Sequence, residues 1–189
     1  MTQNKRVIGI TGGSGCGKSH IAKRLSEMGC YVIDCDEIAR EVTKRGEPCL
    51  LEIKEFFGED ILKDGELNRK KLAGFVFADS KKLQKLDEIT HKFIKERIYN
   101  RINEAKCDTV IVDGAVLLES GLVCDKMVGI LADKQVRKAR IMLRDGLSES
   151  EADRRISAQQ EDEFYLKNCD IVLYNNDEDI SDIIKRILE

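Results

Sequence analysis

Short, continuously apolar runs alternate along this chain with longer stretches of helical periodicity. Five runs rich in β-branched residues predict strands, because an uninterrupted apolar run suits a strand that is buried on both faces. These runs cover residues 7–10, 31–33, 110–112, 127–131 and 171–173. Strands that alternate with helices predict an α/β fold, in which helices pack against a parallel sheet.

Between these runs, apolar residues recur every three or four positions and predict amphipathic helices. Three such faces are Ile21, Leu25 and Met28; Leu83, Leu86, Thr90 and Phe93; and Ile180, Ile183, Ile184 and Ile187. Gly29 is placed to end the first helix, and Ser148 followed by Glu151 has the spacing of a capping box.

The span from about residue 46 to residue 106 separates the second and third predicted strands, and it is much longer than a simple crossover needs. Its pattern predicts a wholly helical insertion beside the sheet. Pro48 is the single proline of the chain, and no repeat or Ser/Gly-rich linker divides the 189 residues. One compact unit is therefore expected.

Composition adds little about partners. The 32 Lys and Arg residues nearly balance the 35 Asp and Glu residues, and neither sign forms a long block. We therefore expect no nucleic acid, no membrane and no obligate protein partner. The seven cysteines are scattered without zinc-ligand spacing, and no targeting segment or membrane-length apolar run occurs, so a reduced, cytoplasmic protein is expected.

The most specific motif is GGSGCGKSH, residues 12–20. It fits the P-loop pattern G-x-x-x-x-G-K-[ST] and lies between a predicted strand and a predicted helix, as that motif requires. Its glycines allow backbone N–H groups to converge on a phosphate at the helix N-terminus. Lys18 is expected to reach the β- and γ-phosphates, and Ser19 to ligate Mg²⁺. The alternative is an ordinary glycine-rich turn.

The motif therefore predicts a set of ATP-binding residues. Within that set, Cys16 is either a small filler or a redox-active thiol, and His20 is expected to contribute its backbone N–H rather than its imidazole. The set is Gly13, Ser14, Gly15, Cys16, Gly17, Lys18, Ser19 and His20.

Two carboxylates follow the second predicted strand. If the backbone stays extended there, Asp34 and Asp36 point to the same side, at the strand ends where ligands of open α/β sheets bind. One could position Mg²⁺ while the other accepts a proton from an attacking hydroxyl. Alternatively, Asp36 caps the next helix. Asp113, which precedes Gly114, is either a magnesium-shell acid or a turn former.

A stripe of arginines is predicted on one helix, at Arg137, Arg140 and Arg144. If the helix docks through the neighbouring apolar stripe, it displays these arginines. They would then either neutralise charge during phosphoryl transfer or form a solvated basic face. The apolar stripe is Val136, Ala139 and Leu143.

Taken in order, several segments resemble the dephospho-CoA kinase family over essentially the whole chain. They are GITGGSGCGKS, VIDCDEIAR, FFGEDIL with DGELNRKKLAGFVFAD, RIMLRDGLSESEADRRISAQ and CDIVLYNN. The resemblance implies a three-layer P-loop kinase fold with a five-stranded parallel sheet, a helical CoA-binding insertion at about 46–106 and a lid at about 137–160. It also implies Mg²⁺- and ATP-dependent phosphorylation of the ribose 3'-hydroxyl of dephospho-CoA, the final step of coenzyme A synthesis.

Carried over by position, the resemblance implies that Asp36 is the general base and that Lys18 and Arg140 also act in catalysis. Arg140 is an ATP-binding residue too, and Asn175 lies near the adenine. The motif and the carboxylate pair make Ser19 and Asp34 the expected magnesium ligands, and the expected substrate-binding residues are Asp36, Arg69, His91 and Glu119.

The chain departs from the family pattern at three positions. His20 replaces the usual Thr or Ser, and Lys92 and Ala115 stand where proline is usual. For His91, a half-buried structural role is the alternative.

Two further functions stay open on the residues themselves. Another P-loop nucleotide or small-molecule kinase would share the fold and differ in its acceptor pocket. A regulatory nucleotide-binding switch belongs to a different class of protein. A guanine-binding [NT]-K-x-D motif is missing after the later strands, and the carboxylate pair favours an enzyme, because binding alone needs no base.

Overall fold

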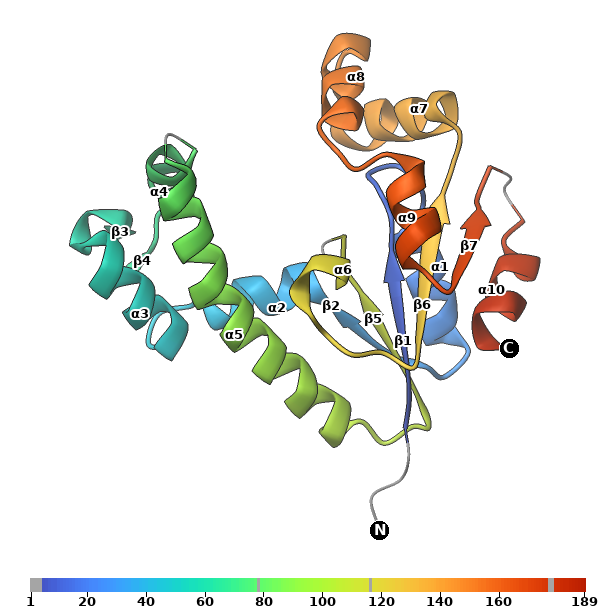
Figure 1. The fold of residues 1–189 in the computed structure, drawn as a ribbon, viewed down its shortest axis with the longest axis horizontal. Coiled ribbons are helices and arrows are strands. Elements are labelled where there is room, and N and C mark those ends of the chain that lie inside the picture. Colours follow the sequence, from blue (N-terminus) through green and yellow to red (C-terminus); the bar gives the residue numbers. More distant parts are fainter. Residues whose placement is uncertain (1–4, 78, 116, 177–178) are drawn as a thin grey trace. The chain divides into compact units, whose positions relative to one another are not determined.

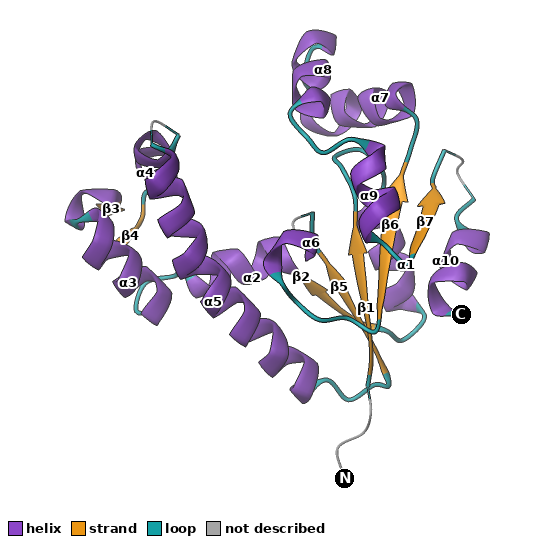
Figure 2. Cartoon of the chain, in the orientation of Figure 1, coloured by secondary structure: helices purple, strands orange, loops and turns teal. Residues whose placement is uncertain are grey.

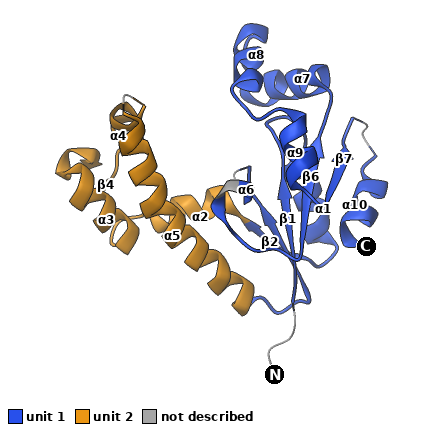
Figure 3. Ribbon diagram, in the orientation of Figure 1, with its two compact units in different colours: residues 1–33, 105–189 blue, residues 34–104 orange. Residues whose placement is uncertain are grey.

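The computed structural model describes residues 5–77, 79–115, 117–176 and 179–189. Their contacts divide the chain into two compact units, coloured separately in Figure 3. Unit 1 comprises the described residues of 1–33 and 105–189, and unit 2 comprises those of 34–104. Unit 2 therefore begins before residue 46, where the helical pattern of the sequence places the start of the insertion.

Unit 1 is built on a five-stranded sheet with the order β2-β5-β1-β6-β7 (Figure 1). Strand β1 pairs in parallel with β5 and with β6, and β6 pairs in parallel with β7. All five predicted strands are confirmed. Their bounds are β1 (Arg6–Thr11), β2 (Tyr31–Asp34), β5 (Thr109–Asp113), β6 (Lys126–Leu131) and β7 (Ile171–Tyr174).

Helices cover both faces of this sheet, which makes the α/β fold three-layered. On one face, α1 (Lys18–Glu27) and α10 (Ser181–Leu188) pack over alternate residues of the strands such as Ile8 and Ile130. On the opposite face, Gly129 leaves room for Tyr165 of α9 (Asp162–Asn168). The short helix α6 (Leu117–Ser120) contacts β1.

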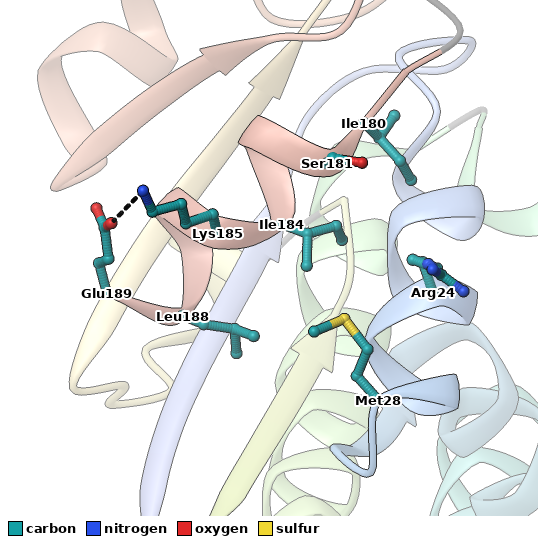
Figure 4. A pocket seen from close by; sticks show the side chains of 8 residues that line it. All are labelled: Arg24, Met28, Ile180, Ser181, Ile184, Lys185, Leu188 and Glu189. Atoms are coloured by element: carbon teal, nitrogen blue, oxygen red, sulfur yellow. Dashed lines mark ion pairs between the residues drawn. The ribbon is translucent and has the colours of Figure 1, made fainter.

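A groove of about 480 Å³ runs between α1 and α10 (Figure 4). Met28, the C-cap of α1, lines it and is 56% exposed, whereas Ile21 and Leu25 of the same predicted face are fully buried. The predicted apolar face of α10 is confirmed, because the three isoleucines of the helix and its N-cap residue Ile180 are all buried. The groove residues are Arg24, Met28, Ile180, Ser181, Ile184, Lys185, Leu188 and Glu189.

Helices α7 (Lys134–Asp145) and α8 (Glu149–Ser157) contact each other as a hairpin. The predicted capping box of Ser148 and Glu151 is present, and its hydrogen bonds lower the pKa of the Glu151 carboxyl. Ile141 packs with Ala152 and Ile156 in a small core of its own. The hairpin therefore carries its own apolar contacts.

The predicted docking face of α7 is confirmed only at Val136, which packs against the core of unit 1. Ala139 is exposed and Leu143 is 90% exposed, whereas Arg137 is only 8% exposed and Ile141 is fully buried. The helix presents its arginine side to the protein, because Arg137 finds hydrogen-bond acceptors there that offset the cost of burying its charge.

Unit 2 is largely helical, but the expectation of a wholly helical insertion is wrong (Figure 2). Strands β3 (Leu62–Lys63) and β4 (Glu66–Leu67) form an antiparallel hairpin. Its turn is Asp64-Gly65, and both residues have positive φ angles. Asp-Gly is a favoured two-residue hairpin turn, so the signal was present in the sequence.

The helices of unit 2 gather around α5 (Ser80–Glu104). Ile89, Ile98 and Ile102 form its buried positions, whereas Leu83 of the predicted face is exposed. Arg97 and Arg101 of α5 pair with Glu41 of α2. The remaining helices are α2 (Cys35–Val42), α3 (Pro48–Phe57), the 3-10 turn η1 (Glu59–Ile61) and α4 (Arg69–Val76). Among the described residues, no helix has the length and apolarity needed to cross a membrane.

Substituting Ile8→Ala in β1 should lower the free energy of unfolding by about 2–5 kcal/mol, because it empties a fully buried core position. Leu143→Ala, at the exposed face of α7, should change that free energy by less than about 0.5 kcal/mol. Urea unfolding of the two variants measures both values. A large loss in Leu143→Ala would show that the apolar stripe of α7 is docked after all.

Candidate phosphate-binding site

The P-loop connects the carboxyl end of β1 to the first turn of α1. Gly17 is the N-cap of α1 and has a φ of 88°, which L side chains rarely adopt. A Cβ at Gly17 would lie 2.2 Å from Nδ2 of Asn175, and one at Gly15 would lie 2.6 Å from the carbonyl oxygen of Arg137. The glycines therefore admit neighbouring groups as well as a phosphate.

Side chains hold five consecutive carbonyl groups of the loop, those of Gly12 to Cys16. Nζ of Lys18 donates to the carbonyl of Gly12 at 2.6 Å and to that of Gly13 at 3.5 Å. Other donors come from distant segments. Nε of Arg137 donates to the carbonyl of Ser14 at 3.0 Å, and Nη1 of Arg140 donates to that of Gly15 at 3.4 Å. Nδ2 of Asn175 donates to the carbonyl of Cys16 at 2.8 Å.

This arrangement orients the peptide groups of the loop. The N–H and C=O of one peptide group point in opposite directions, so holding the carbonyls of Ser14 and Cys16 turns the N–H groups of Gly15 and Gly17 away from the holding side chains. In the described part of the chain, those two N–H groups have no protein acceptor. The loop thus resembles an anion-binding nest at a helix N-terminus.

Asn175 follows β7 and is 3% exposed. Its backbone carbonyl accepts a hydrogen bond from Arg140 at 2.8 Å, which places Arg140 and Asn175 together beside the loop. Within the described residues, Oδ1 of Asn175 is buried and lacks a hydrogen-bond partner. A buried acceptor without a donor costs about 1–3 kcal/mol, so this oxygen favours a ligand that brings an N–H group.

The arginine stripe divides into two parts. Arg137 is buried and Arg140 is half-buried, and both face the loop. Arg144 is exposed and pairs through two hydrogen bonds of 2.8 Å with Asp145, which lowers the pKa of that carboxyl. The interpretation of the stripe as a wholly solvated basic face is therefore wrong.

Gln159 is a loop contact that the sequence reading missed. Its Oε1 accepts the N–H of Ser14 at 2.9 Å and Nη2 of Arg137 at 2.7 Å. The residue ends the RISAQ segment of the family resemblance, which was the available signal. Gln159 also lines a cavity of about 350 Å³ beside Gly12 and Gly13.

Cys16 and His20 contact neighbouring groups of the loop itself. Cys16 is 1% exposed, and its Sγ lies 3.9 Å from Nζ of Lys18, which fits the filler interpretation. The N–H of His20 donates to the carbonyl of Gly17 at 3.1 Å, and the His20 side chain is exposed. This N–H closes the first turn of α1 rather than pointing to a phosphate.

The backbone that carries Asp34 and Asp36 differs from the prediction. Strand β2 ends at Asp34, and α2 begins at Cys35, so the backbone is not extended through Asp36. Oδ1 of Asp34 accepts the N–H groups of Asp36 at 2.8 Å and Glu37 at 3.3 Å. Asp34 therefore caps α2, the capping alternative for Asp36 is wrong, and the Asp36 carboxylate is exposed in the first helical turn.

The predicted substrate residues lie in separate elements. Arg69 begins α4 and donates from Nη2 to Oγ1 of Thr43 at 2.8 Å. His91 is half-buried in α5, which is consistent with substrate binding and also with the alternative of a half-buried structural role. Glu119 belongs to α6, but its side chain lies outside the described part of the chain.

Mg²⁺ is a hard cation that prefers oxygen ligands and commonly binds through substrate phosphates with one or two protein oxygens. Ser19, exposed in the first turn of α1, offers a hydroxyl of that kind. Among the described residues, no three His, Cys, Asp or Glu side chains gather into a cluster. The Ser19 hydroxyl fits a metal that arrives with a nucleotide and its phosphates.

The site combines a P-loop between a strand and a helix of a parallel sheet with arginines from a helical hairpin. This combination defines a kinase of the P-loop class. Solved structures with this fold include a shikimate kinase from Acinetobacter baumannii, with a TM-score of 0.55 at 14% identity, covering 98% of this chain and 92% of that one. TT1252 from Thermus thermophilus has a TM-score of 0.84 at 30% identity, covering 98% and 97%.

The comparison of sequences is more specific. The dephospho-CoA kinase family model matches residues 6–182. The dephospho-CoA kinase of Corynebacterium glutamicum is 40% identical over 175 residues, which are 89% of this chain and 88% of that protein. The enzyme from Campylobacter jejuni has a TM-score of 0.67 at 26% identity, covering 97% and 94%. This chain belongs to the dephospho-CoA kinase family.

Gly17→Ala should abolish most nucleotide binding, because its Cβ would displace Asn175 from the loop. Gly46→Ala is the matched control, since Gly46 has a φ of 89° but nothing within 4 Å of the added Cβ. Both substitutions should cost about 1–2 kcal/mol of stability for the left-handed backbone. ADP binding by calorimetry should weaken more than tenfold in Gly17→Ala alone. Equal weakening in both variants would show that backbone strain, and not the approach of Asn175, explains the effect.

Proposed function

We propose that this chain transfers the γ-phosphoryl group of ATP to the ribose 3'-hydroxyl of dephospho-CoA, giving CoA and ADP in the last step of coenzyme A synthesis. The proposal rests on the family match over residues 6–182. A bond forms between the 3'-oxygen and the γ-phosphorus, and the bond from that phosphorus to the bridging oxygen of ADP breaks. The proton of the hydroxyl passes to a base.

The proposed ATP site is the loop with its supporting side chains. The N–H groups of Gly15 and Gly17 bind phosphate oxygens, with Gly13, Ser14, Cys16 and His20 shaping the surrounding backbone. Lys18 exchanges the carbonyls of Gly12 and Gly13 for the β- and γ-phosphates, since its ammonium already lies at the loop. Mg²⁺, bound through Ser19 and with Asp34 on its hydration shell, supplies charge neutralisation at the phosphates.

Arg140 and Asn175 complete the proposed ATP site. Arg140 donates to the carbonyls of both Gly15 and Asn175, and this position beside the loop supports a role in neutralising charge on the transferred group. Oδ1 of Asn175 accepts an N–H from the adenine, which supplies the donor that this buried oxygen lacks among the described residues.

The proposed acceptor site uses residues of unit 2. Asp36 accepts the proton of the 3'-hydroxyl, because its carboxylate is exposed and its helical turn is fixed by the cap of Asp34. Arg69 and His91 bind dephospho-CoA, together with Glu119 from α6. Catalysis then consists mainly of positioning and of charge neutralisation.

The acceptor is tested by measuring ADP release with ATP and one candidate at a time: dephospho-CoA, nucleoside monophosphates, shikimate or no acceptor. We expect rapid release with dephospho-CoA alone and a product that carries a new 3'-phosphate by mass spectrometry and phosphorus NMR. Equal release without dephospho-CoA would refute the proposed acceptor.

Asp36→Asn should leave ATP binding intact and lower kcat by about 10²–10⁴-fold, because the variant lacks a base for the hydroxyl proton. Glu37→Gln is the matched control, since Glu37 is an exposed carboxylate in the same helical turn. Steady-state kinetics at saturating substrates measures the effect. If kcat of Asp36→Asn stays within about tenfold, or about 1.4 kcal/mol, Asp36 is not the base.

A further inference from the structure

One residue of the P-loop, Ser14, is held through both of its backbone groups. The carbonyl of Ser14 accepts Nε of Arg137 at 3.0 Å, and the N–H of Ser14 donates to Oε1 of Gln159 at 2.9 Å. Arg137 and Gln159 are themselves joined, because Nη2 of the arginine donates to the same Oε1 at 2.7 Å. Both backbone groups of Ser14 are thus committed to one Arg–Gln pair.

We propose that Arg137 and Gln159 are positioning residues that set the conformation of the P-loop before a nucleotide binds. Their role is distinct from that of Arg140, whose bonds to Gly15 and Asn175 both come from Nη1 and leave its Nε and Nη2 for a phosphate. The inference rests on the proposed function only in assuming that the loop binds ATP and ADP.

The space at Gly13 supports this assignment. A Cβ there would lie 2.4 Å from Nη2 of Arg137 and 2.8 Å from Oε1 of Gln159. The pair therefore fills the volume that the missing side chain leaves, in close contact with the backbone. Arg137 is 8% exposed, so its charge is stabilised by these acceptors rather than by water.

The same contacts argue against Arg137 as a mobile group that neutralises phosphate charge. To reach a phosphate, Arg137 would have to give up its bonds to the Ser14 carbonyl and to Oε1 of Gln159, which would leave the part-buried Ser14 carbonyl without its donor. Losing such bonds costs about 1–3 kcal/mol for each buried group that is left unpaired. Holding the loop therefore costs Arg137 less free energy than contacting a phosphate would.

The pair also connects the loop to the α7–α8 hairpin at both ends of the hairpin. Arg137 lies in the first turn of α7, and Gln159 follows the end of α8. Between them the hairpin is closed by Lys138, which bonds Glu149 at 2.6 Å and Asp153 at 3.4 Å. The hairpin base and the backbone of Ser14 therefore form one hydrogen-bonded assembly.

A positioning role predicts a characteristic kinetic result. A loop that is already shaped binds the phosphates of ATP and ADP in the ground state and the transition state alike. Losing that shape removes uniform binding, which raises KM and Kd while leaving kcat nearly unchanged. Loss of a charge-neutralising arginine would instead lower kcat at saturating ATP.

The test compares Gln159→Met and Arg137→Lys with two controls on the exposed side of α7, Gln135→Met and Arg144→Lys. Three quantities are measured: Kd for ADP by calorimetry, KM and kcat with dephospho-CoA, and the hydrogen exchange of the Ser14 amide by NMR. Gln159→Glu is added as the conservative variant, because it keeps an oxygen acceptor for Ser14 and Arg137.

We expect both site variants to weaken ADP binding and raise KM for ATP at least tenfold, with kcat within threefold of the parent, while the controls change neither. Exchange of the Ser14 amide should accelerate at least tenfold in Gln159→Met and return toward the parent rate in Gln159→Glu. Exchange in Gln159→Met that matches the parent would overturn the proposal. So would a loss of kcat beyond tenfold in Arg137→Lys with unchanged ADP affinity.

The binding and exchange measurements need no acceptor substrate. If the parent protein binds ADP and the variants behave as expected, the pair is supported even where dephospho-CoA is not phosphorylated. In that case only the proposed acceptor fails.

Discussion

The orientation of the P-loop peptides is the constraint on which the site depends. A phosphate can be bound by backbone N–H groups only if the carbonyl groups point elsewhere, and a peptide carbonyl needs a hydrogen-bond donor wherever it points. In this protein the carbonyls from Gly12 to Cys16 have donors from Lys18, Arg137, Arg140 and Asn175. The side chains behind the loop therefore define the surface that the loop presents to a nucleotide.

Because of this constraint, the conformation of the loop depends on the later part of unit 1. Three of the four donors come from segments that lie more than a hundred residues beyond the loop, at the start of α7 and after β7. The parallel sheet brings these segments to the carboxyl end of β1, because β6 is the neighbour of β1 and β7 is the neighbour of β6. Glycines then allow the donors to approach the backbone closely.

The same reasoning accounts for α7, whose amphipathic pattern is misleading. A buried arginine is costly unless its donors are satisfied, and for that reason an arginine stripe normally indicates a solvated face. The Ser14 carbonyl of the glycine-rich loop and Oε1 of Gln159 supply the missing acceptors. The helix consequently docks through Val136, Arg137 and Ile141, and its Leu143 is left in solvent.

The sequence by itself determined the five strands, the position of the P-loop, the capping box and the membership of a kinase family, because each depends on local periodicity or on residues at fixed short spacing. The tertiary structure alone decided which face of α7 is buried, that Asp34 rather than Asp36 caps α2, and that Gln159 and Asn175 reach the loop. These outcomes depend on hydrogen-bond partners that are remote in sequence or on where a strand stops. Periodicity records which residues share a face, but the partner that the fold brings to that face determines whether it is buried.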